Sequence, residues 1–143
     1  MQDKSDLIVD SFMIGYNCEE IRFKRKLGAK LNKITLSIPN KSFDTTSNIL
    51  TLIFSVKLDF VDSKENFFRF TSGFKINNIE ILNDNFDQKY LPIFISSLFP
   101  YVRNYITTIT NDSSNPVIIP TIDLRKINLN NSVELSFTNK KLT

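Results

Sequence analysis

Four carboxylates and one thiol are the residues of this sequence that come closest to a catalytic grouping. Cys18 is followed directly by Glu19 and Glu20, and Asp84 and Asp87 form the other close acidic grouping. Two carboxylates can act as general acid and base in glycoside hydrolysis, and a thiolate can act as a nucleophile. Acidic neighbours raise the pKa of a thiol, so we interpret Cys18 as a packed or unreactive side chain. The carboxylates are interpreted as surface and turn residues.

Several classes of enzyme are excluded because the residues they need are missing. The sequence contains no histidine, so Ser-His-Asp and Cys-His arrangements and the zinc sites that use histidine cannot be built. The three glycines stand singly, at Gly15, Gly28 and Gly73, and neither glycine-rich nucleotide-binding loop occurs. We therefore expect a protein that is not an enzyme and has no metal site.

Positive charge is concentrated in one short segment. The basic residues of this segment are Arg22, Lys24, Arg25, Lys26, Lys30 and Lys33. Our main interpretation is a solvated strand end, with an acidic protein partner or nucleic acid as alternatives. The net charge of +3 is too small by itself to indicate nucleic-acid binding, and no nucleic-acid partner is expected.

The compartment is indicated by cysteine usage and by the apolar segments. Cys18 is the only cysteine, which is typical of a reducing compartment, and the polar residues 1–6 do not resemble a secretory signal. The most apolar segment, residues 90–102, is interrupted by Pro92 and Pro100 and is shorter than the roughly 20 residues of a membrane span. We expect a cytoplasmic protein that does not insert into membranes.

Composition predicts a single folded domain over residues 1–143, with a core of about residues 12–124. Hydrophobic residues make up 41% of the chain and charged residues 23%, which is typical of a globular protein. The chain has thirteen phenylalanines and no tryptophan. Such an aromatic load fills a core, builds a subunit interface, or lines a surface that meets apolar partners.

Apolar residues that alternate with polar ones predict an antiparallel meander. Residues 50–60 alternate strictly and give the strongest strand signal, and residues 68–78 complete a hairpin with them. Residues 12–25 predict a strand with a bulge near Glu19 and Glu20. Residues 27–48 are interpreted as a long crossover connection that contains one short strand at residues 34–38.

The pattern changes to helical spacing in the second half of the chain. Apolar residues from 98 to 109 recur on one face, so we expect a helix with Ser97 as N-cap and Pro100 in its first turn. Residues 86–96 are compatible with a shorter helical piece. The polar segment 111–116 should end the helix, residues 117–124 are extended and apolar, and residues 133–137 would permit a terminal strand.

Two motifs resemble signatures of the SecB family of protein-export chaperones. The sequence LFPYVRN at residues 98–104 resembles the LFPYARE signature that opens the long helix of SecB proteins. The sequence NPVIIPTID at residues 115–123 is similar to the family's FPxxxLAPVNF stretch. Together with the order of strand, long loop and hairpin, the resemblance covers about residues 12–124.

The resemblance implies an α+β subunit with a four-stranded antiparallel sheet, a long crossover loop and helices packed on one face. It implies a homotetramer, built as a dimer of dimers, that binds unfolded polypeptide clients without ATP or any other cofactor. Family members hold precursors for export and some pass them to the translocase motor, whereas some relatives protect the antitoxin of a toxin–antitoxin pair. Exporting members of the family are acidic, whereas this chain has a net charge of +3, and its sequence after Leu124 does not resemble their helical, acidic terminus. Both differences fit a chaperone with one dedicated client.

A holdase needs exposed apolar surface of low geometric specificity. By position, the client-binding candidates are Leu36, Ile38, Phe43, Phe86, Tyr90, Phe94, Ile119 and Ile122. The competing interpretation for each candidate is an ordinary core residue. The candidates for helix packing and the oligomer interface are Phe99, Tyr101, Val102, Tyr105 and Ile106. Two other functions stay open, which are a small hydrophobic-ligand-binding domain and a self-assembling structural protein.

Overall fold

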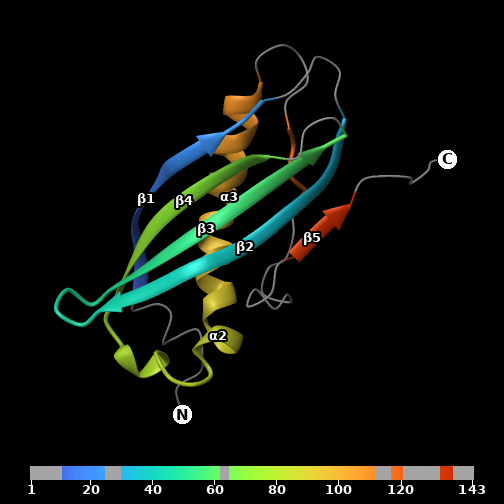
Figure 1. The fold of residues 1–143 in the computed structure, drawn as a ribbon. Helices are drawn as coiled ribbons and strands as arrows, with labels where there is room; N and C mark the ends of the chain where they lie inside the picture. Colours follow the sequence, from blue (N-terminus) through green and yellow to red (C-terminus); the bar gives the residue numbers. More distant parts are fainter. Residues whose placement is uncertain (1–10, 25–29, 62–64, 112–116, 121–132, 137–143) are drawn as a thin grey trace.

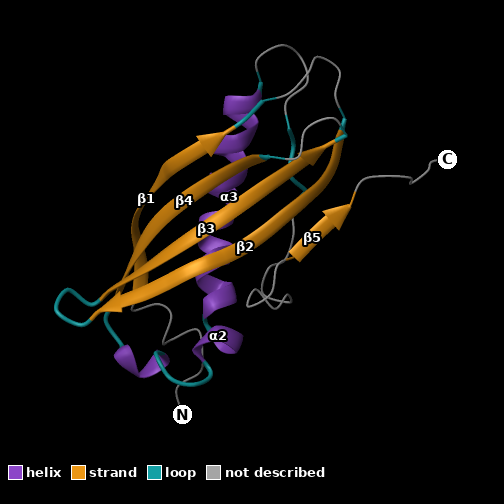
Figure 2. Cartoon of the chain, viewed as in Figure 1, coloured by secondary structure: helices purple, strands orange, loops and turns teal. Residues whose placement is uncertain are grey.

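The computed structural model describes residues 11–24, 30–61, 65–111, 117–120 and 133–136. These residues form an antiparallel sheet of five strands with the order β1-β4-β3-β2-β5 (Figure 1). The strands are β1 (Ser11–Arg22), β2 (Leu31–Asp44), β3 (Ile49–Phe60), β4 (Asn66–Ile76) and β5 (Val133–Ser136). The helical elements are the short η1 (Ile79–Ile81), α2 (Phe86–Lys89) and the long α3 (Leu91–Thr110). The helix α3 crosses one face of the sheet (Figure 2).

The central strands β3 and β4 confirm the predicted strand at 50–60 and its hairpin. Their register places large side chains opposite one another on the α3 face, including the pair Phe54 and Phe70. The ring of Phe54 meets Phe99 of α3 at a centroid distance of 6.3 Å, and Phe74 meets Phe94 at 5.0 Å. Period-two alternation thus gives the sheet one apolar face, and that face forms the core with α3.

The edge strand β1 contains two irregularities in its pairing with β4. One lies between Cys18 and Glu20, as predicted, and a second lies between Met13 and Gly15. Each inserted residue reverses the alternation of the strand. As a result Tyr16 pairs opposite the buried Ser72 and faces α3, where its ring lies 5.3 Å from that of Tyr101.

The predicted long crossover at residues 27–48 is wrong, because β2 occupies 14 residues of it and pairs with β3 along its length. The pairing of β2 with β3 shifts by one residue between Ser37 and Asn40, at Pro39. Even-numbered residues face α3 before the shift and odd-numbered residues after it, so the sequence of β2 shows no continuous alternation. The connection from β2 to β3 is a tight turn. Asn48 adopts a φ of 60° there, and its N–H donates a 2.8 Å hydrogen bond to the carbonyl of Asp44.

The long helix begins earlier than predicted. It starts at Leu91, with Pro92 in its first turn, and Pro100 lies inside it on the exposed side. Ser97 is therefore not an N-cap, and its hydroxyl donates to the carbonyl of Ile93 at 3.3 Å. An interior proline removes one helical hydrogen bond. The buried side chains on both sides of it form one continuous face, which outweighs this cost: Leu91, Ile95, Leu98, Phe99, Val102 and Ile106.

The last described segments add to the sheet and to the core. Val117 and Ile119 are buried, and Arg103 Nε donates to the carbonyl of Ile119 at 3.0 Å. Strand β5 pairs antiparallel with β2, which confirms a terminal strand and gives five strands instead of the four that the resemblance implies. Within the described ranges, no helix has the length and apolar character needed to cross a membrane.

Candidate functional site

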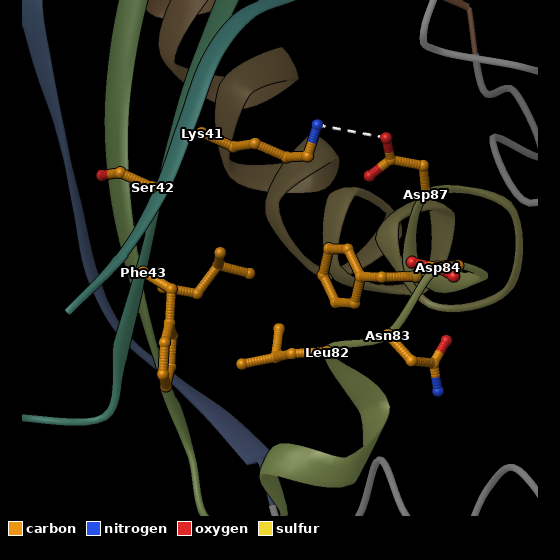
Figure 3. Close-up of a pocket in the computed structure, with 9 residues that line it drawn as sticks. Lys41, Ser42, Phe43, Leu82, Asn83, Asp84 and Asp87 are labelled. Carbon is orange, nitrogen blue, oxygen red and sulfur yellow. Dashed lines mark ion pairs between the residues drawn. The ribbon is translucent and has the colours of Figure 1, made fainter. Parts of the chain in front are cut away.

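A groove opens to solvent between the end of β2 and the segment that leads into α2 (Figure 3). It encloses about 420 Å³. A cavity of several hundred Å³ is large enough for one or two apolar side chains or for a small organic molecule. The lining residues are Lys41, Ser42, Phe43, Leu50, Leu82, Asn83, Asp84, Phe86 and Asp87.

The wall opposite β2 is shaped by a run of asparagine-stabilised turns. The side chain of Asn78 accepts from the N–H of Glu80 at 3.0 Å and caps η1. Asn83 then donates to the carbonyl of Glu80 at 2.9 Å and accepts from the N–H of Asn85 at 2.8 Å. Such local side-chain bonds favour turns over regular structure. They fix the backbone on both sides of Leu82.

The floor of the groove is apolar and supported from below. Leu50 and Phe86 are almost completely buried, and the Phe86 ring lies 6.3 Å from that of Tyr90 and 5.9 Å from that of Phe94. Phe43 and Leu82 are only partly buried against the same core. Phe43 and Leu82 therefore offer the apolar surface that a bound molecule would contact, whereas Phe86 holds the floor in place.

The rim of the groove is charged. Lys41 extends from β2 toward Asp87 in the first turn of α2, and its Nζ lies 3.1 Å from Oδ2 of Asp87 (Figure 3). Asp84 is exposed at the same rim. The lining residues thus include two carboxylates and one ammonium group, and the ammonium group is paired with Asp87. Ser42 points to the opposite side of β2 in the same view.

The structure brings together part of the client-binding set. Phe43 and Phe86 line the groove, and Tyr90 and Phe94 lie behind Phe86 as buried supports. Leu36 and Ile119 are buried core residues that do not line the groove, and Ile38 is partly buried. Ile122 lies outside the described residues. Sequence reasoning missed Lys41, Leu82 and the role of Asp87.

The predicted interface residues divide into buried and exposed side chains. Phe99, Val102 and Ile106 are buried beneath the sheet, which places them in the core of the subunit. Tyr105 is partly buried, with its ring 5.4 Å from that of Phe70. Tyr101 is 46% exposed. Among these five residues, Tyr101 has the most surface left for contact with a second subunit.

Cys18 and Glu20, which were singled out in the sequence, lie on β1 and do not line the groove. The pKa of the Cys18 thiol is raised, mainly by burial and also by the charge of Glu19, while a hydrogen bond with Tyr105 opposes the shift. Glu20 forms an exposed ion pair with Arg69 on the face away from α3. No group of three or more potential metal ligands occurs in the part of the chain that the structure describes.

The sequence matches no protein-family model. No curated protein matches it either. Among solved structures, it is similar to the crystal structure of a protein of unknown function from Streptococcus agalactiae. The two sequences are 14% identical, the match covers 78% of this chain and 93% of that chain, and the TM-score is 0.29. A TM-score of this size assigns neither a shared fold nor a function.

Proposed function

We propose that the groove binds apolar segments of unfolded polypeptides and that the protein is an ATP-independent chaperone of the SecB type. The observation that carries this proposal is the partly exposed pair Phe43 and Leu82 beside the buried floor of Leu50 and Phe86. A holdase needs apolar contacts without a demanding geometry, because its clients share no sequence. The groove provides such contacts.

The shape of the groove favours a polypeptide over a compact small molecule. Small-molecule sites bury most of their ligand in an enclosed pocket with a few converging polar groups. This groove is open to solvent, and the ammonium group of Lys41 at its rim is already paired with Asp87. An open groove does not enclose its ligand, so a client bound by one apolar segment can continue into solvent.

The wider proposal follows the SecB resemblance. The subunits assemble in the cytoplasm as a dimer of dimers and hold clients without a cofactor, and no reaction is catalysed. Clients are either precursors for export, which some chaperones pass to the translocase motor, or one dedicated partner such as an antitoxin. The net charge of +3 favours the dedicated partner, because acidic surfaces serve motor docking in exporting members.

The test is suppression of aggregation of a chemically unfolded model protein at stoichiometric chaperone, without ATP, with oligomer mass recorded by light scattering. We expect suppression by the wild-type protein and its loss in Phe43→Ser. Phe12→Ser is the matched control, because Phe12 is 56% exposed on the opposite face of the sheet. No suppression by the wild-type protein, or equal suppression by both variants, would refute the proposal. Tight uptake of one apolar compound without suppression would favour the ligand-binding alternative instead.

A further inference from the structure

A second cavity lies on the face of the sheet that points away from α3. It encloses about 350 Å³, is open to solvent, and lies over the neighbouring strands β1, β4 and β3 (Figure 1). We call it the sheet hollow. It shares no lining residue with the groove. Its walls include Ile14, Asn17, Ile49, Thr51 and Thr71.

Two opposed glycines form the floor of the sheet hollow. Gly15 of β1 pairs opposite Gly73 of β4, and Gly73 pairs opposite Thr51 of β3. Residues two apart on a strand point to the same face, so Thr71 and Lys75 stand on either side of this glycine row. Two neighbouring positions without side chains therefore leave the backbone open between two rows that carry them.

The fold itself does not need glycine at either position. Neither residue has a positive φ, and a Cβ on Gly15 would meet no atom within 4 Å. A Cβ on Gly73 would lie 3.6 Å from Cγ2 of Ile49, which is an ordinary van der Waals contact. Glycine weakens the interior of a strand, and it often marks a place where a ligand approaches the backbone closely. What this pair provides is open space above two strands.

Polar groups with unused bonding capacity stand on both sides of the glycine row. The Oγ1 atom of Thr71 is buried and has no hydrogen-bond partner among the described residues, although buried polar atoms are normally bonded. Rotation about its Cα–Cβ bond brings this hydroxyl toward the sheet hollow. The ammonium group of Lys75 donates to the carbonyl of Ser47 at 2.6 Å, which leaves two of its three donors. Within the described ranges no carboxylate forms an ion pair with it, so this side of the hollow favours negative charge.

We infer that the sheet hollow binds a small molecule that consists of one flat aromatic ring with a carboxylate. The ring lies on the backbone of the two glycines, since a floor without side chains is complementary to a planar face. Ile14 and Ile49 contact the ring from the sides, and the carboxylate is directed toward Lys75. The volume is at the lower end of the roughly 300–1,000 Å³ that small-molecule sites occupy, which suits a single ring. This site is independent of the proposed chaperone function, because the two cavities share no lining residue.

The test uses nuclear magnetic resonance on protein labelled at glycine nitrogen. The chain has 3 glycines, so the spectrum contains few backbone signals, and Gly15→Ala and Gly73→Ala each remove one and thereby assign it. The probes are benzoate, neutral benzamide, cationic benzamidine and the non-planar cyclohexanecarboxylate. We expect benzoate to move the signals of both Gly15 and Gly73 with a Kd on the order of 1 mM, because an open site buries only part of its ligand. Benzamide should bind more weakly, and benzamidine and cyclohexanecarboxylate more weakly still.

Three variants locate the site, and thermal unfolding checks that each is folded. Gly15→Val fills the hollow with a side chain that strands favour, so it should weaken benzoate binding at least about tenfold without lowering Tm. Ser55→Val is the matched control on the same face, opposite Arg69, and should bind like the wild-type protein. Lys75→Gln should remove the preference for benzoate over benzamide.

Three results would overturn the inference. The first is that saturating benzoate moves neither glycine signal. The second is that benzamidine or cyclohexanecarboxylate binds as tightly as benzoate, since the site would then select neither charge nor planarity. The third is that Gly15→Val binds benzoate like the wild-type protein, which would place the ligand elsewhere. None of these results bears on suppression of aggregation by the groove.

Discussion

The ammonium group of Lys41 lies 3.1 Å from the carboxylate of Asp87, and this ion pair joins the end of β2 to the first turn of α2. The two residues come from opposite walls of the groove. The side chain of Lys41 is 38% exposed and that of Asp87 is 32% exposed, so water screens their attraction. The pair therefore positions the walls more than it stabilises the fold.

The first prediction concerns this ion pair. A double-mutant cycle with Lys41→Met and Asp87→Asn should give a coupling energy of about 0.2–1 kcal/mol, the range for exposed ion pairs. Urea unfolding of the four proteins measures it. The coupling should shrink at high salt, because screening reduces the attraction. A coupling energy above about 2 kcal/mol would show that the ion pair contributes substantially to the stability of the fold, contrary to this prediction.

The second prediction compares two neighbours on β3. Leu52 is fully buried on the α3 face, whereas Ile53 lies on the opposite face and is only partly buried. Leu52→Ala should lower the free energy of unfolding by about 2–5 kcal/mol, because it leaves a cavity in the core. Ile53→Ala should cost clearly less, as measured by chemical denaturation. Equal losses would mean that the second face is also covered in solution.

The third prediction concerns Pro100. Its nitrogen carries no hydrogen, so the carbonyl of Ser96 lacks its helical partner, and the ring crowds that carbonyl. Pro100→Ala should raise the free energy of unfolding by about 1–3 kcal/mol, because proline is about 3 kcal/mol less favourable than alanine in a helix interior. Pro92→Ala is the control and should bring no such gain, since Pro92 lies in the first turn, where its missing N–H costs no helical hydrogen bond, and its ring is buried. Destabilisation by Pro100→Ala would show that the ring makes contacts the helix needs.

The fourth prediction is a pH effect at the turn between β2 and β3. Hydrogen bonds from the N–H of Thr46 and from the hydroxyl of Ser47 lower the pKa of the Asp44 carboxyl. Because the folded pKa is below the unfolded one, the stabilisation is present above the unfolded pKa of about 3.9 and is lost as pH falls through the folded pKa.

Asp44→Asn should therefore weaken the loss of stability on acidification below about pH 4. Unfolding curves across this range measure the effect. Nuclear magnetic resonance titration of Ser47→Ala should show a higher Asp44 pKa than in the wild-type protein, since the bond from the Ser47 hydroxyl is gone. An unchanged pKa in Ser47→Ala would contradict the assigned cause.

The fifth prediction concerns thiol reactivity. Burial raises the pKa of Cys18, and its thiol donates to the carbonyl of Glu20. Alkylation near pH 8 should therefore be slower in the folded protein than in the same protein in denaturant, because the thiolate is the reactive form. Tyr105→Phe should slow it further, since the bond with Tyr105 lowers the pKa. Equal rates in the folded and unfolded protein would contradict this cause.

Strands of the sheet could be predicted from the sequence where only one of their two faces is buried. Strands β3 and β4 keep period two because every second side chain enters the core, and the hairpin follows from that pattern. Of strand β2 only the short stretch at residues 34–38 was predicted. The remainder was missed because the register shift at Pro39 changes the parity of its apolar residues and because its last residues are mostly polar. The start of α3 was missed because Ser97 and Pro100 together imitate a helix start.

The groove was only partly predictable for a similar reason. Phe43 and Phe86 were selected as aromatic residues in segments of uncertain structure, and the fold places both at the same cavity. Leu82 and Lys41 gave no signal, since their position depends on where β2 ends relative to α2. Leu36 lies in an alternating apolar stretch and Ile119 in an apolar run, and both are buried core residues that do not line the groove.

The order of the strands constrains how the chain assembles during synthesis. Strands β2, β3 and β4 are each next to their sequence neighbour, so they can pair as soon as they leave the ribosome. Strand β1 is made before these three, yet among the described strands it pairs with β4 alone, and β4 follows two further strands. Strand β1, with the apolar residues Phe12, Ile14 and Ile21, must therefore wait for β4 before it can pair as it does in the folded sheet.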